Sequence, residues 1–592
     1  MPGSYVIGES PIRLRRHLSF PILNWHWGGR CSTLSIALLL IPGWLAQGQA
    51  PDSLQILRNA RDAQREFERN RKAHLSYDWD NRSGFCDLRV GRFCYWYDAS
   101  PDRPPEPEAI GRARTRLLRT LAAAGAELPG DDWILGQRVR YLVEDRRAGL
   151  AVTLTQECLG TRWWCDALEG FARHAGGDYE GADQAFELAL TAMPEKQRCA
   201  WTDLSPLLKD ARQYRKLACG ERLARSQRIW WLADPLYSVA GNDLRTEHYS
   251  RHTMALLLED AANPYGISWS DDMRELLVRF GWPTHWARSY LPGSLESPRV
   301  VGHERDPSFW LFPRPVLTDP WFDVTAVRWE PMIERPPARY APTYATGLVP
   351  ITGVQFARFR RGDTTVTIAA LVLKPDSVFA GGTEIRLAVA RDPATPIEVG
   401  RASPAGRYAV ASVRSRWRPR VLSLETMRPS MGPVGRWRVI VPPDPAGLAP
   451  DLSDILLVAP APAGELPSSL GEAAAAALRP AVVRAGHRVG LYWEMYDTSY
   501  RTDTVQVAIT VTKARSKHEA PYPVGRPECP PRVASPVTVR WQEEPGTAPR
   551  NAARSIALDL RPLSRGRYVV AVQISEAGRT RGCSSRELQI VE

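Results

Sequence analysis

Lysine is scarce in this chain even though the chain is basic. Only seven of its 77 basic residues are lysine, and the formal net charge of the 592 residues is +12. No cluster of Lys and Arg with interleaved aromatic residues occurs, and such clusters are typical of nucleic-acid-binding surfaces. The charge therefore predicts a scattered basic surface and no nucleic-acid partner.

Long hydrophobic runs are also missing. The strongest candidate, Leu34 to Ile41, is much shorter than the stretch of about 20 residues that spans a bilayer, so we expect no transmembrane segment in the mature chain. Basic residues precede this run, and small residues follow it from Ala46 to Ala50, which is the order of a secretory signal peptide. We expect residues 1–50 to be removed and the rest to be exported to the periplasm or the extracellular space.

The common catalytic fingerprints are absent. The chain has no Gly-x-Ser-x-Gly elbow, no Walker loop and no Gly-rich dinucleotide motif. His248 and His252 have a helical spacing that can bind zinc, but Glu247 lies on the wrong side for a metalloprotease and no third ligand is identifiable. Glu494 has no nameable partner for glycoside hydrolysis, and we expect it to be an exposed strand residue. We therefore predict no catalytic residue, no metal and no cofactor.

The cysteine spacing does not favour a structural zinc site, because no Cys-x-x-Cys or Cys-x-x-His occurs. Eight cysteines remain after the predicted leader, and an even number in an oxidising compartment predicts disulfides. Cys529 and Cys583 are alone in the C-terminal region and are expected to pair. The other six form close neighbours whose connectivity the sequence leaves open: Cys86 and Cys94, Cys158 and Cys165, Cys199 and Cys219.

Helical periodicity dominates residues 51–220. Apolar residues recur at helical spacing over 52–75 and 108–127, and residues 132–158 predict a helical hairpin. A segment at 166–194 resembles a tetratricopeptide repeat in its small residues, seam aromatics and closing proline: Gly170, Gly177, Tyr179, Ala182, Phe186, Ala189 and Pro194. Because one repeat cannot bury its own face, we expect about three hairpins, an array that most often binds a protein or peptide.

Aromatic, charged and turn residues are concentrated between Arg228 and Arg288. This stretch resembles the bacterial family named for a Gly-Trp-x-Thr-Asp (GWxTD) motif, found in exported multidomain proteins, at Asp234, Asn242, Glu247, Arg251, Trp269, Asp272, Gly281 and Pro283. Ser268 and Asp271 replace the Gly and Thr of the motif. The resemblance implies a strand near residues 276–280 and no assigned chemistry.

The residue types in this stretch indicate a structural role. Glu247 and Arg251 are four apart on a predicted helix and are expected to form an ion pair. Trp269, Phe280 and Trp282 are expected to be largely buried near that pair.

After residue 350 the apolar period changes to two, which predicts strands. The expected fold class is a multidomain α+β protein in which tetratricopeptide-like helical hairpins and a small α/β GWxTD-like module precede two antiparallel β-sandwich domains. The expected boundaries are 51–220 for the helical domain, 221–300 for the module, 301–350 for a Pro-rich linker, 351–460 for the first sandwich, 461–485 for a second linker and 486–592 for the second sandwich.

The sequence leaves two functional hypotheses open. The leading one is an exported scaffold or protein-interaction protein of the bacterial envelope, whose protein or peptide partner is unknown. The alternative is a secreted hydrolase with a cleft between the central module and the first β domain. Convergent buried carboxylates or histidines in that cleft favour the hydrolase, whereas an exposed apolar-aromatic groove on the repeats favours the scaffold.

Overall fold

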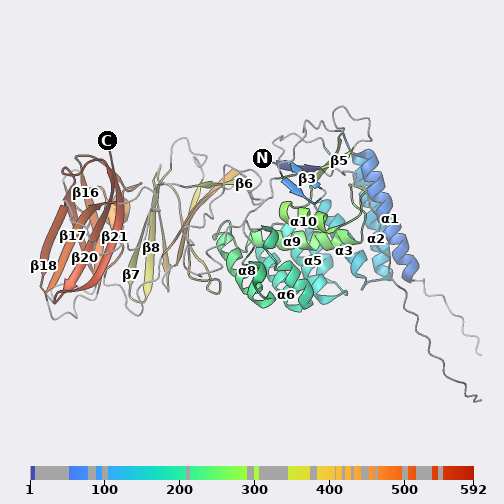
Figure 1. The fold of residues 1–592 in the computed structure, drawn as a ribbon, viewed down its shortest axis with the longest axis horizontal. Coiled ribbons are helices and arrows are strands. Elements are labelled where there is room, and N and C mark those ends of the chain that lie inside the picture. The colour runs from blue at the N-terminus through green and yellow to red at the C-terminus, as the bar shows by residue number, and fades with distance from the viewer. Residues whose placement is uncertain are drawn as a thin grey trace, which may run out of the picture.

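The computed structural model places helices first and antiparallel sheets second. The helical region and the two β domains follow one another along the long axis of the molecule, as Figure 1 shows. The multidomain α+β fold class is therefore confirmed. The structure describes residues 2–6, 53–77, 88–91, 93–96, 105–207, 212, 214–289, 299–305, 344–351, 353–373, 383–406, 408–416, 420–428, 432–441, 452–460, 464–496, 504–514, 537–544 and 551–592.

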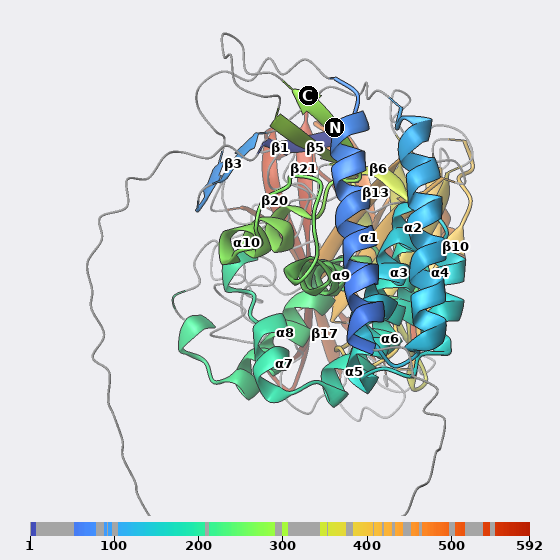
Figure 2. The same ribbon diagram turned by 90° about the vertical axis from the view of Figure 1, so that its right-hand side faces the viewer.

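Successive helices of the N-terminal half pack against each other in pairs. Figure 2 shows α1 and α2 side by side along one edge of this region. The pairs α3/α4 and α5/α6 follow, and α9 packs across α5 and α6. None of the helices in the described ranges combines the length and hydropathy of a membrane-spanning segment. The helices are α1 (Ser53–His74), α2 (Glu108–Glu127), α3 (Asp132–Glu144), α4 (Ala148–Gln156), α5 (Arg162–Ala175), α6 (Tyr179–Ala192), α7 (Glu195–Trp201), α8 (Cys219–Ala233), α9 (Asp243–Glu259) and α10 (Asp271–Phe280).

The α5/α6 hairpin contains the residues that resemble a tetratricopeptide repeat. Gly170 on α5 lies against the ring of Phe186 on α6, and a Cβ at Gly170 would be only 2.9 Å from ring atoms. Tyr179, Ala182, Phe186 and Ala189 are buried. Gly177 has a φ of +80° in the turn before α6, and Pro194 caps α7 directly after α6. The resemblance itself stays a prediction.

A five-stranded sheet covers one end of the helical region. Its order is β2-β3-β1-β5-β4, and β1 pairs with both β3 and β5. Because β1 lies in the segment predicted to be a removable leader, a mature chain that began near residue 51 would lack the central strand of this sheet. The strands are β1 (Pro2–Val6), β2 (Leu88–Val90), β3 (Phe93–Trp96), β4 (His285–Ser289) and β5 (Arg299–Arg305).

The first β domain consists of two facing sheets. Their orders are β10-β9-β12-β13-β6 and β11-β8-β7. The side chains of β11 alternate between exposed and buried, as its period of two predicts. β6 lies in the predicted Pro-rich linker but pairs in parallel with β13. The strands are β6 (Ala345–Pro350), β7 (Gln355–Arg361), β8 (Thr364–Val372), β9 (Glu384–Ala390), β10 (Glu398–Ala402), β11 (Tyr408–Ser415), β12 (Val421–Met427) and β13 (Gly432–Ile440).

The second β domain also has two sheets, of orders β14-β16-β19 and β15-β21-β20-β17-β18. β14 follows the first domain in sequence but pairs with β16 of the second. Helix α12 and strand β15 lie in the predicted linker 461–485. The elements are β14 (Leu456–Val458), α12 (Leu470–Ala476), β15 (Val482–Arg484), β16 (Arg488–Tyr496), β17 (Val505–Lys513), β18 (Val537–Glu543), β19 (Asn551–Asp559), β20 (Gly566–Glu576) and β21 (Arg579–Val591).

One expected element is wrong. Residues 276–280 form the second half of helix α10 and not a strand. The helix begins after Ser270 and ends at Gly281, whose φ of +85° favours glycine at a helix C-terminus. The buried residues of this segment have helical spacing: Met273, Leu276, Leu277 and Phe280. A short apolar run in the sequence fits a strand as well as a helix, so the pattern alone did not distinguish them.

Candidate functional site at the helix–sheet junction

The connection between α8 and α9 contains two of the motif residues. Helix α8 ends at Ala233, because Asp234 precedes a proline and adopts an extended conformation. The Asn242 side chain caps α9 by accepting a hydrogen bond from the backbone of Arg245 at 2.9 Å. It also donates to the carbonyl oxygen of Trp230 at 2.7 Å, so Asn242 ties the start of α9 to α8.

Gly241 brings this connection against the start of α6. Its φ is +79°, and a Cβ there would lie 2.3 Å from the carbonyl carbon of Tyr179 and 2.4 Å from the backbone nitrogen of Glu180. Backbone atoms cannot move aside as a flexible side chain does. Glycine is therefore required here both by its conformation and by the close approach of α6.

Side chains of the first β domain hold the α8–α9 connection. Glu425 on β12 accepts hydrogen bonds from the backbone N–H groups of Tyr237 and Ser238, both at 2.9 Å. Arg436 on β13 donates to the carbonyl oxygens of Asp234 at 3.1 Å and Pro235 at 3.0 Å. These bonds satisfy backbone groups that follow the end of a helix, so the two regions meet through a specific polar contact.

The buried guanidinium groups at this contact carry an electrostatic cost. Arg436 is buried, and burial together with the neighbouring Arg438 lowers the pKa of Arg436 to about 9. Arg438 donates to the carbonyl oxygen of Leu232 at 2.9 Å and lies over the ring of Tyr237. Glu425, which is fully buried, is the nearest compensating carboxylate.

A cavity of about 430 Å³ lies beside this contact, between α6, α8, α9 and the turn after β9. Pro393 and Ile397 close it from the β domain. Carboxyl, guanidinium, amide and indole groups line its helical side: Asp183, Glu187, Trp230, Trp231, Asp234, Asn242 and Arg245. Two predicted motif residues, Asp234 and Asn242, therefore meet in the wall of one cavity with residues that the sequence did not single out.

Asp183, Glu187 and Arg245 form an ionic group in this wall. Arg245 Nη1 lies 3.2 Å from Asp183 Oδ1, and the other terminal nitrogen of Arg245 bonds Glu187. The backbone N–H of Asn242 donates to Asp183 Oδ2 at 2.9 Å. Burial raises the pKa of Asp183, although Arg245 and this hydrogen bond oppose the rise. Burial opposes the charge of Arg245, but the carboxylates of Asp183 and Glu187 raise its pKa.

Asp234 has a different environment in the same wall. Its side chain is 6% exposed, and its Oδ1 atom has no hydrogen-bond partner within the described part of the chain. Burial raises the pKa of Asp234 well above its usual value, and the carboxylates of Asp243, Glu425 and Asp183 raise it further against the attraction of Arg438. Burial therefore favours the protonated form of Asp234 more than it does for an exposed aspartate.

No protein-family model matches the sequence, and no curated protein matches it. Among solved structures, the chain is similar to the transglutaminase of red sea bream, with 9% sequence identity and a TM-score of 0.13. That match covers 41% of this chain and 32% of the transglutaminase, so the chain spans about a third of its length. A likeness this slight carries no argument about fold or activity.

The Glu247–Arg251 pair lies away from the cavity and joins three helices. Arg251 Nε donates to Glu247 Oε1 at 2.6 Å, and His174 of α5 lies 2.8 Å from Glu247 Oε2. Arg251 also donates to the carbonyl oxygens of Val278 and Arg279 at the end of α10. Burial opposes the charge of Glu247, but Arg251 and His174 lower its pKa far below the usual range. The pair thus links α5, α9 and α10.

His248 and His252 lie in an apolar environment. His248 Nε2 is 3.1 Å from the carbonyl oxygen of Trp201, and the ring of His252 stacks on the Trp201 indole. Burial lowers the pKa of His248 to about 3 and that of His252 well below its usual value. No three His, Cys, Asp or Glu side chains in the described ranges gather where a metal ion could be held.

The remaining motif residues surround α10. Phe280 is fully buried, and Trp269 and Trp282 are partly buried and packed against the core. Asp272 accepts a hydrogen bond from the backbone of Met273 at 3.0 Å, but Ser270 is the N-cap. Pro283 is buried against β5, where a Cβ at Gly302 would come within 2.3 Å of it.

Two disulfides connect consecutive helices. Cys158 pairs with Cys165 across the α4–α5 connection, and Cys199 pairs with Cys219 between α7 and α8. Cys583 is also disulfide-bonded. Cys94 lies in β3. Cys86 and Cys529 lie outside the described residues.

Glu494 is not the exposed strand residue that the sequence indicated. It is buried on β16, and its Oε1 accepts hydrogen bonds from Arg361 at 2.7 Å and from the Tyr492 hydroxyl at 2.9 Å. Arg361 belongs to β7 of the first β domain, so Glu494 joins the two β domains. The partner comes from a residue 133 positions away, which no local pattern reveals.

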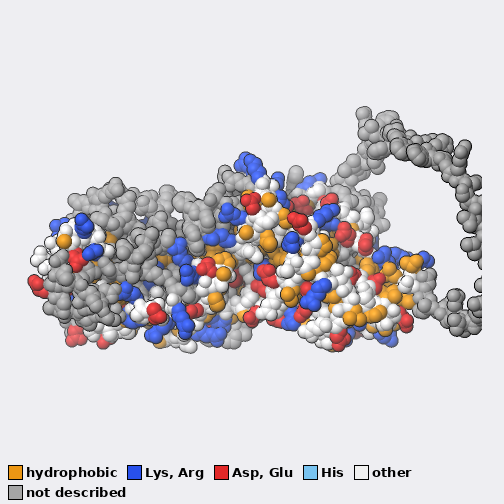
Figure 3. Space-filling model, turned by 90° about the horizontal axis from the view of Figure 1, so that it is seen from below, with side chains coloured by type: hydrophobic (Ala, Val, Ile, Leu, Met, Phe, Trp, Pro, Cys, Tyr) orange, Lys and Arg blue, Asp and Glu red, His pale blue; other side chains and the backbone are white. Residues whose placement is uncertain are grey.

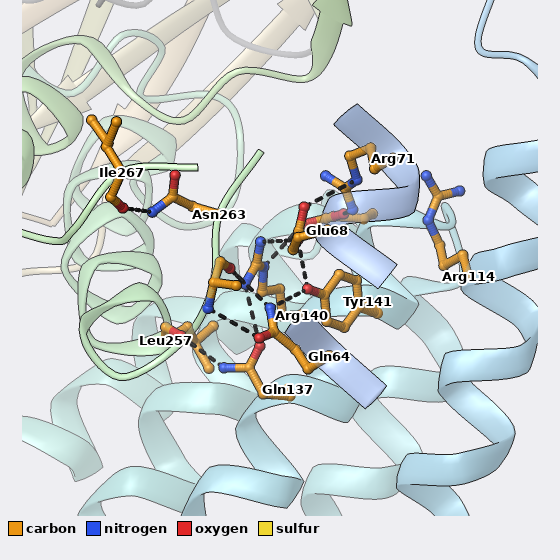
Figure 4. A network of polar contacts seen from close by, with 12 residues as sticks. Gln64, Glu68, Arg71, Arg114, Gln137, Arg140, Tyr141, Leu257, Asn263 and Ile267 are labelled. Carbon is orange, nitrogen blue, oxygen red and sulfur yellow. Dashed lines mark hydrogen bonds and ion pairs between the residues drawn. The ribbon is translucent and has the colours of Figure 1, made fainter. Parts of the chain in front are cut away.

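A second buried polar network holds α1 on α3 (Figure 4). Glu68 accepts hydrogen bonds from Tyr141 at 2.6 Å and Arg140 at 3.0 Å. Arg71 pairs with Glu144, and Gln64 bonds Tyr141. Burial raises the pKa of Glu68, whereas Arg71 and Arg140 overcome burial and lower the pKa of Glu144 to about 2. Each polar side chain labelled in this network bonds at least one other protein group, so the network fastens α1 to α3.

Proposed function

We propose that the protein is an exported scaffold of the bacterial envelope, in which the helical hairpins bind a protein or peptide and the β domains hold them at a fixed orientation. The observation that carries this proposal is the contact at the α8–α9 connection. Glu425 and Arg436 bond backbone groups there instead of mobile side chains, and such bonds fix a position as well as a distance.

Exposed leucines on the helical hairpins supply a contact surface for this role. Leu150 on α4, Leu159 after α4 and Leu188 on α6 are 51%, 72% and 53% exposed. Figure 3 shows apolar side chains among charged ones across the helical region on the face seen from below. Burial of such leucines in a partner is favourable by about 25 cal/mol per Å² of apolar area.

Site-specific crosslinking tests this proposal in the native envelope. A photo-crosslinking residue at Leu159 or Leu188 is expected to give the same discrete adduct. The matched control is Tyr408, which is 45% exposed on β11 of the first β domain and is expected to give none. Adducts of equal yield from all three positions, or from none, would contradict a partner surface on the helices.

The alternative function, a secreted hydrolase, is favoured by one observation. The junction cavity lies between the central module and the first β domain, and carboxyl groups of Asp183, Glu187 and Asp234 line it. A carboxyl group with a raised pKa beside a second carboxyl group is a combination used in glycoside hydrolysis. Turnover of chromogenic glycosides or esters that is abolished in Asp234→Asn would support a hydrolase. A protein that turned over neither class of substrate would contradict this function.

A further inference from the structure

We propose that the junction cavity binds a compact organic cation through an ammonium or guanidinium group. This site is independent of the partner surface on the helical hairpins. Its wall combines carboxyl groups with the indole ring of Trp231, which is the chemistry that recognises organic cations.

Carboxyl groups outnumber guanidinium groups around Asp234, although the whole chain is basic. The groups facing Asp234 from the packed elements are Asp183 and Glu187 of α6, Asp243 and Arg245 of α9, Glu425 of β12 and Arg436 and Arg438 of β13, with the hydroxyls of Tyr237 and Tyr344. With Asp234 included, five carboxyl groups therefore meet three guanidinium groups, in a protein whose formal net charge is +12.

Among the described residues, the hydrogen bonds and ion pairs of these guanidinium groups go to acceptors other than the Asp234 carboxyl. Arg245 bonds Asp183 and Glu187, whereas Arg436 and Arg438 donate to backbone carbonyl oxygens. Asp234 Oδ1 is left without a hydrogen-bond partner in the described part of the chain, although the side chain is more than nine-tenths buried. No protein donor in the described ranges therefore satisfies this oxygen, and the cavity that Asp234 lines can admit an N–H donor on a cationic ligand beside its carboxyl group.

The volume of the cavity and its aromatic lining both favour a small cationic ligand. A cavity of about 430 Å³ is within the range of small-molecule sites. Indole faces attract cations and repel anions, and the surplus of carboxyl groups does the same. A neutral sugar also stacks on tryptophan, so it is the competing occupant that the experiment must distinguish.

A cation that bonds Asp234 favours its ionised form. Burial raises the pKa of Asp234, so a proton held by this carboxyl in the free protein is released to solvent when the cation supplies the opposite charge. Binding therefore strengthens as pH rises. The affinity is expected to increase by up to about tenfold per pH unit while Asp234 of the free protein stays protonated.

Isothermal titration of the full chain tests the site with matched pairs of probes. Methylguanidinium and 1,4-diaminobutane are the cationic probes, and methylurea and 1,4-butanediol are their neutral counterparts. At least one cationic probe is expected to bind about tenfold or more tightly than its neutral counterpart. Titration in two buffers of different ionisation enthalpy is expected to show proton release. Equal affinity within both pairs, tighter binding of glucose, or no binding of either cation would overturn the proposal.

The variant Asp234→Asn tests the residue that carries the inference. Asparagine keeps the size of a neutral aspartic acid, so the fold is expected to persist, and a thermal melt checks this. Proton release is expected to fall and cation affinity to drop about tenfold. Asp271→Asn is the matched control, because the Asp271 side chain is 97% exposed on α10. Unchanged cation binding and proton release in Asp234→Asn would contradict the proposal, and if that variant fails to fold, Trp231→Phe must weaken cation binding instead.

Discussion

Two aspartates at the two inter-domain contacts have opposite environments. Asp454, between the β domains, is bonded by Arg358 through both carboxylate oxygens at 2.8 and 3.1 Å. Burial opposes its charge, but Arg358 lowers its pKa. Asp234, at the helix–sheet junction, is buried without such a partner, and its pKa is raised. The Asp454 contact is matched in charge and joins the two domains, whereas the Asp234 contact has more carboxyl than guanidinium groups and retains a carboxyl oxygen without a hydrogen-bond partner among the residues that the structure describes.

The largest loss of stability is expected when Glu425, the carboxylate that pairs with Arg438 at the helix–sheet junction, is removed. Glu425→Ala removes the acceptor for two backbone N–H groups and leaves Arg438 buried with less compensation. Breaking such a buried pair costs about 4 kcal/mol of unfolding free energy. Chemical denaturation followed by tryptophan fluorescence measures it. Glu157→Ala, at an exposed position, is the control, and equal loss in the two variants would refute a specific joint.

Gly241→Ala is expected to have the next largest effect. The new Cβ would meet the backbone of Tyr179 and Glu180, and alanine disfavours a φ of +79°. We expect a loss of about 3 kcal/mol, with faster hydrogen exchange in residues 234–242. Gly362→Ala is the control, because its φ is also positive but nothing lies within 4 Å of the added carbon. If both variants lose the same stability, the close approach of α6 does not matter.

A smaller loss is expected at the contact between the β domains. Glu494→Gln keeps the shape but removes the charge, and its amide must face two donors, Arg361 and Tyr492. Arg361 is partly solvated, so we expect about 2 kcal/mol. Glu587→Gln, which interrupts the more exposed pair with Arg567, should change stability by less than about 0.5 kcal/mol. Calorimetry that ranks these two variants the other way would disprove this order.

The smallest effect on stability is expected from Asp234→Asn, and its sign depends on pH. Because the folded pKa of Asp234 is raised, ionisation favours the unfolded chain once pH exceeds the unfolded value of about 3.9. Asparagine does not ionise, so this stabilisation of the unfolded chain is lost in the variant. The melting temperature of the variant should therefore be higher than that of the parent protein at pH 7 and equal to it at pH 3. A shift of about 2 °C is within the resolution of a thermal melt. A lower melting temperature at pH 7 would show that Asp234 is ionised.

The helices of the N-terminal half could be predicted from local periodicity, whereas the helix–sheet junction could not. Residues 108–127 were expected to be helical, and α2 has those bounds, because Ile110, Leu117 and Leu121 form one apolar face. The cavity instead combines Asp183, Asp234 and Ile397, which are far apart in sequence and come together only when the β domain docks.

Buried charges were the least predictable part of the site. Glu425 and Glu494 both interrupt apolar strands, and such an interruption was the only local sign of their roles. Their burial is explained by ion pairs with residues on other strands, Arg438 for Glu425 and Arg361 for Glu494. Strand period alone assigns such residues to the solvent face.

Strand β14 contacts both β domains, so neither domain is complete without it. β14 pairs with β16 of the second domain, while the amide of Gln355, from β7 of the first, accepts from the backbone of Leu457 at 2.7 Å. A chain cut between residues 460 and 464 would thus leave two fragments that complement each other noncovalently. A gene fusion that transplanted either β domain alone, with its limit at residue 460, would take this strand away from its sheet. We therefore expect the two domains to keep their structure in another protein only when they are moved together.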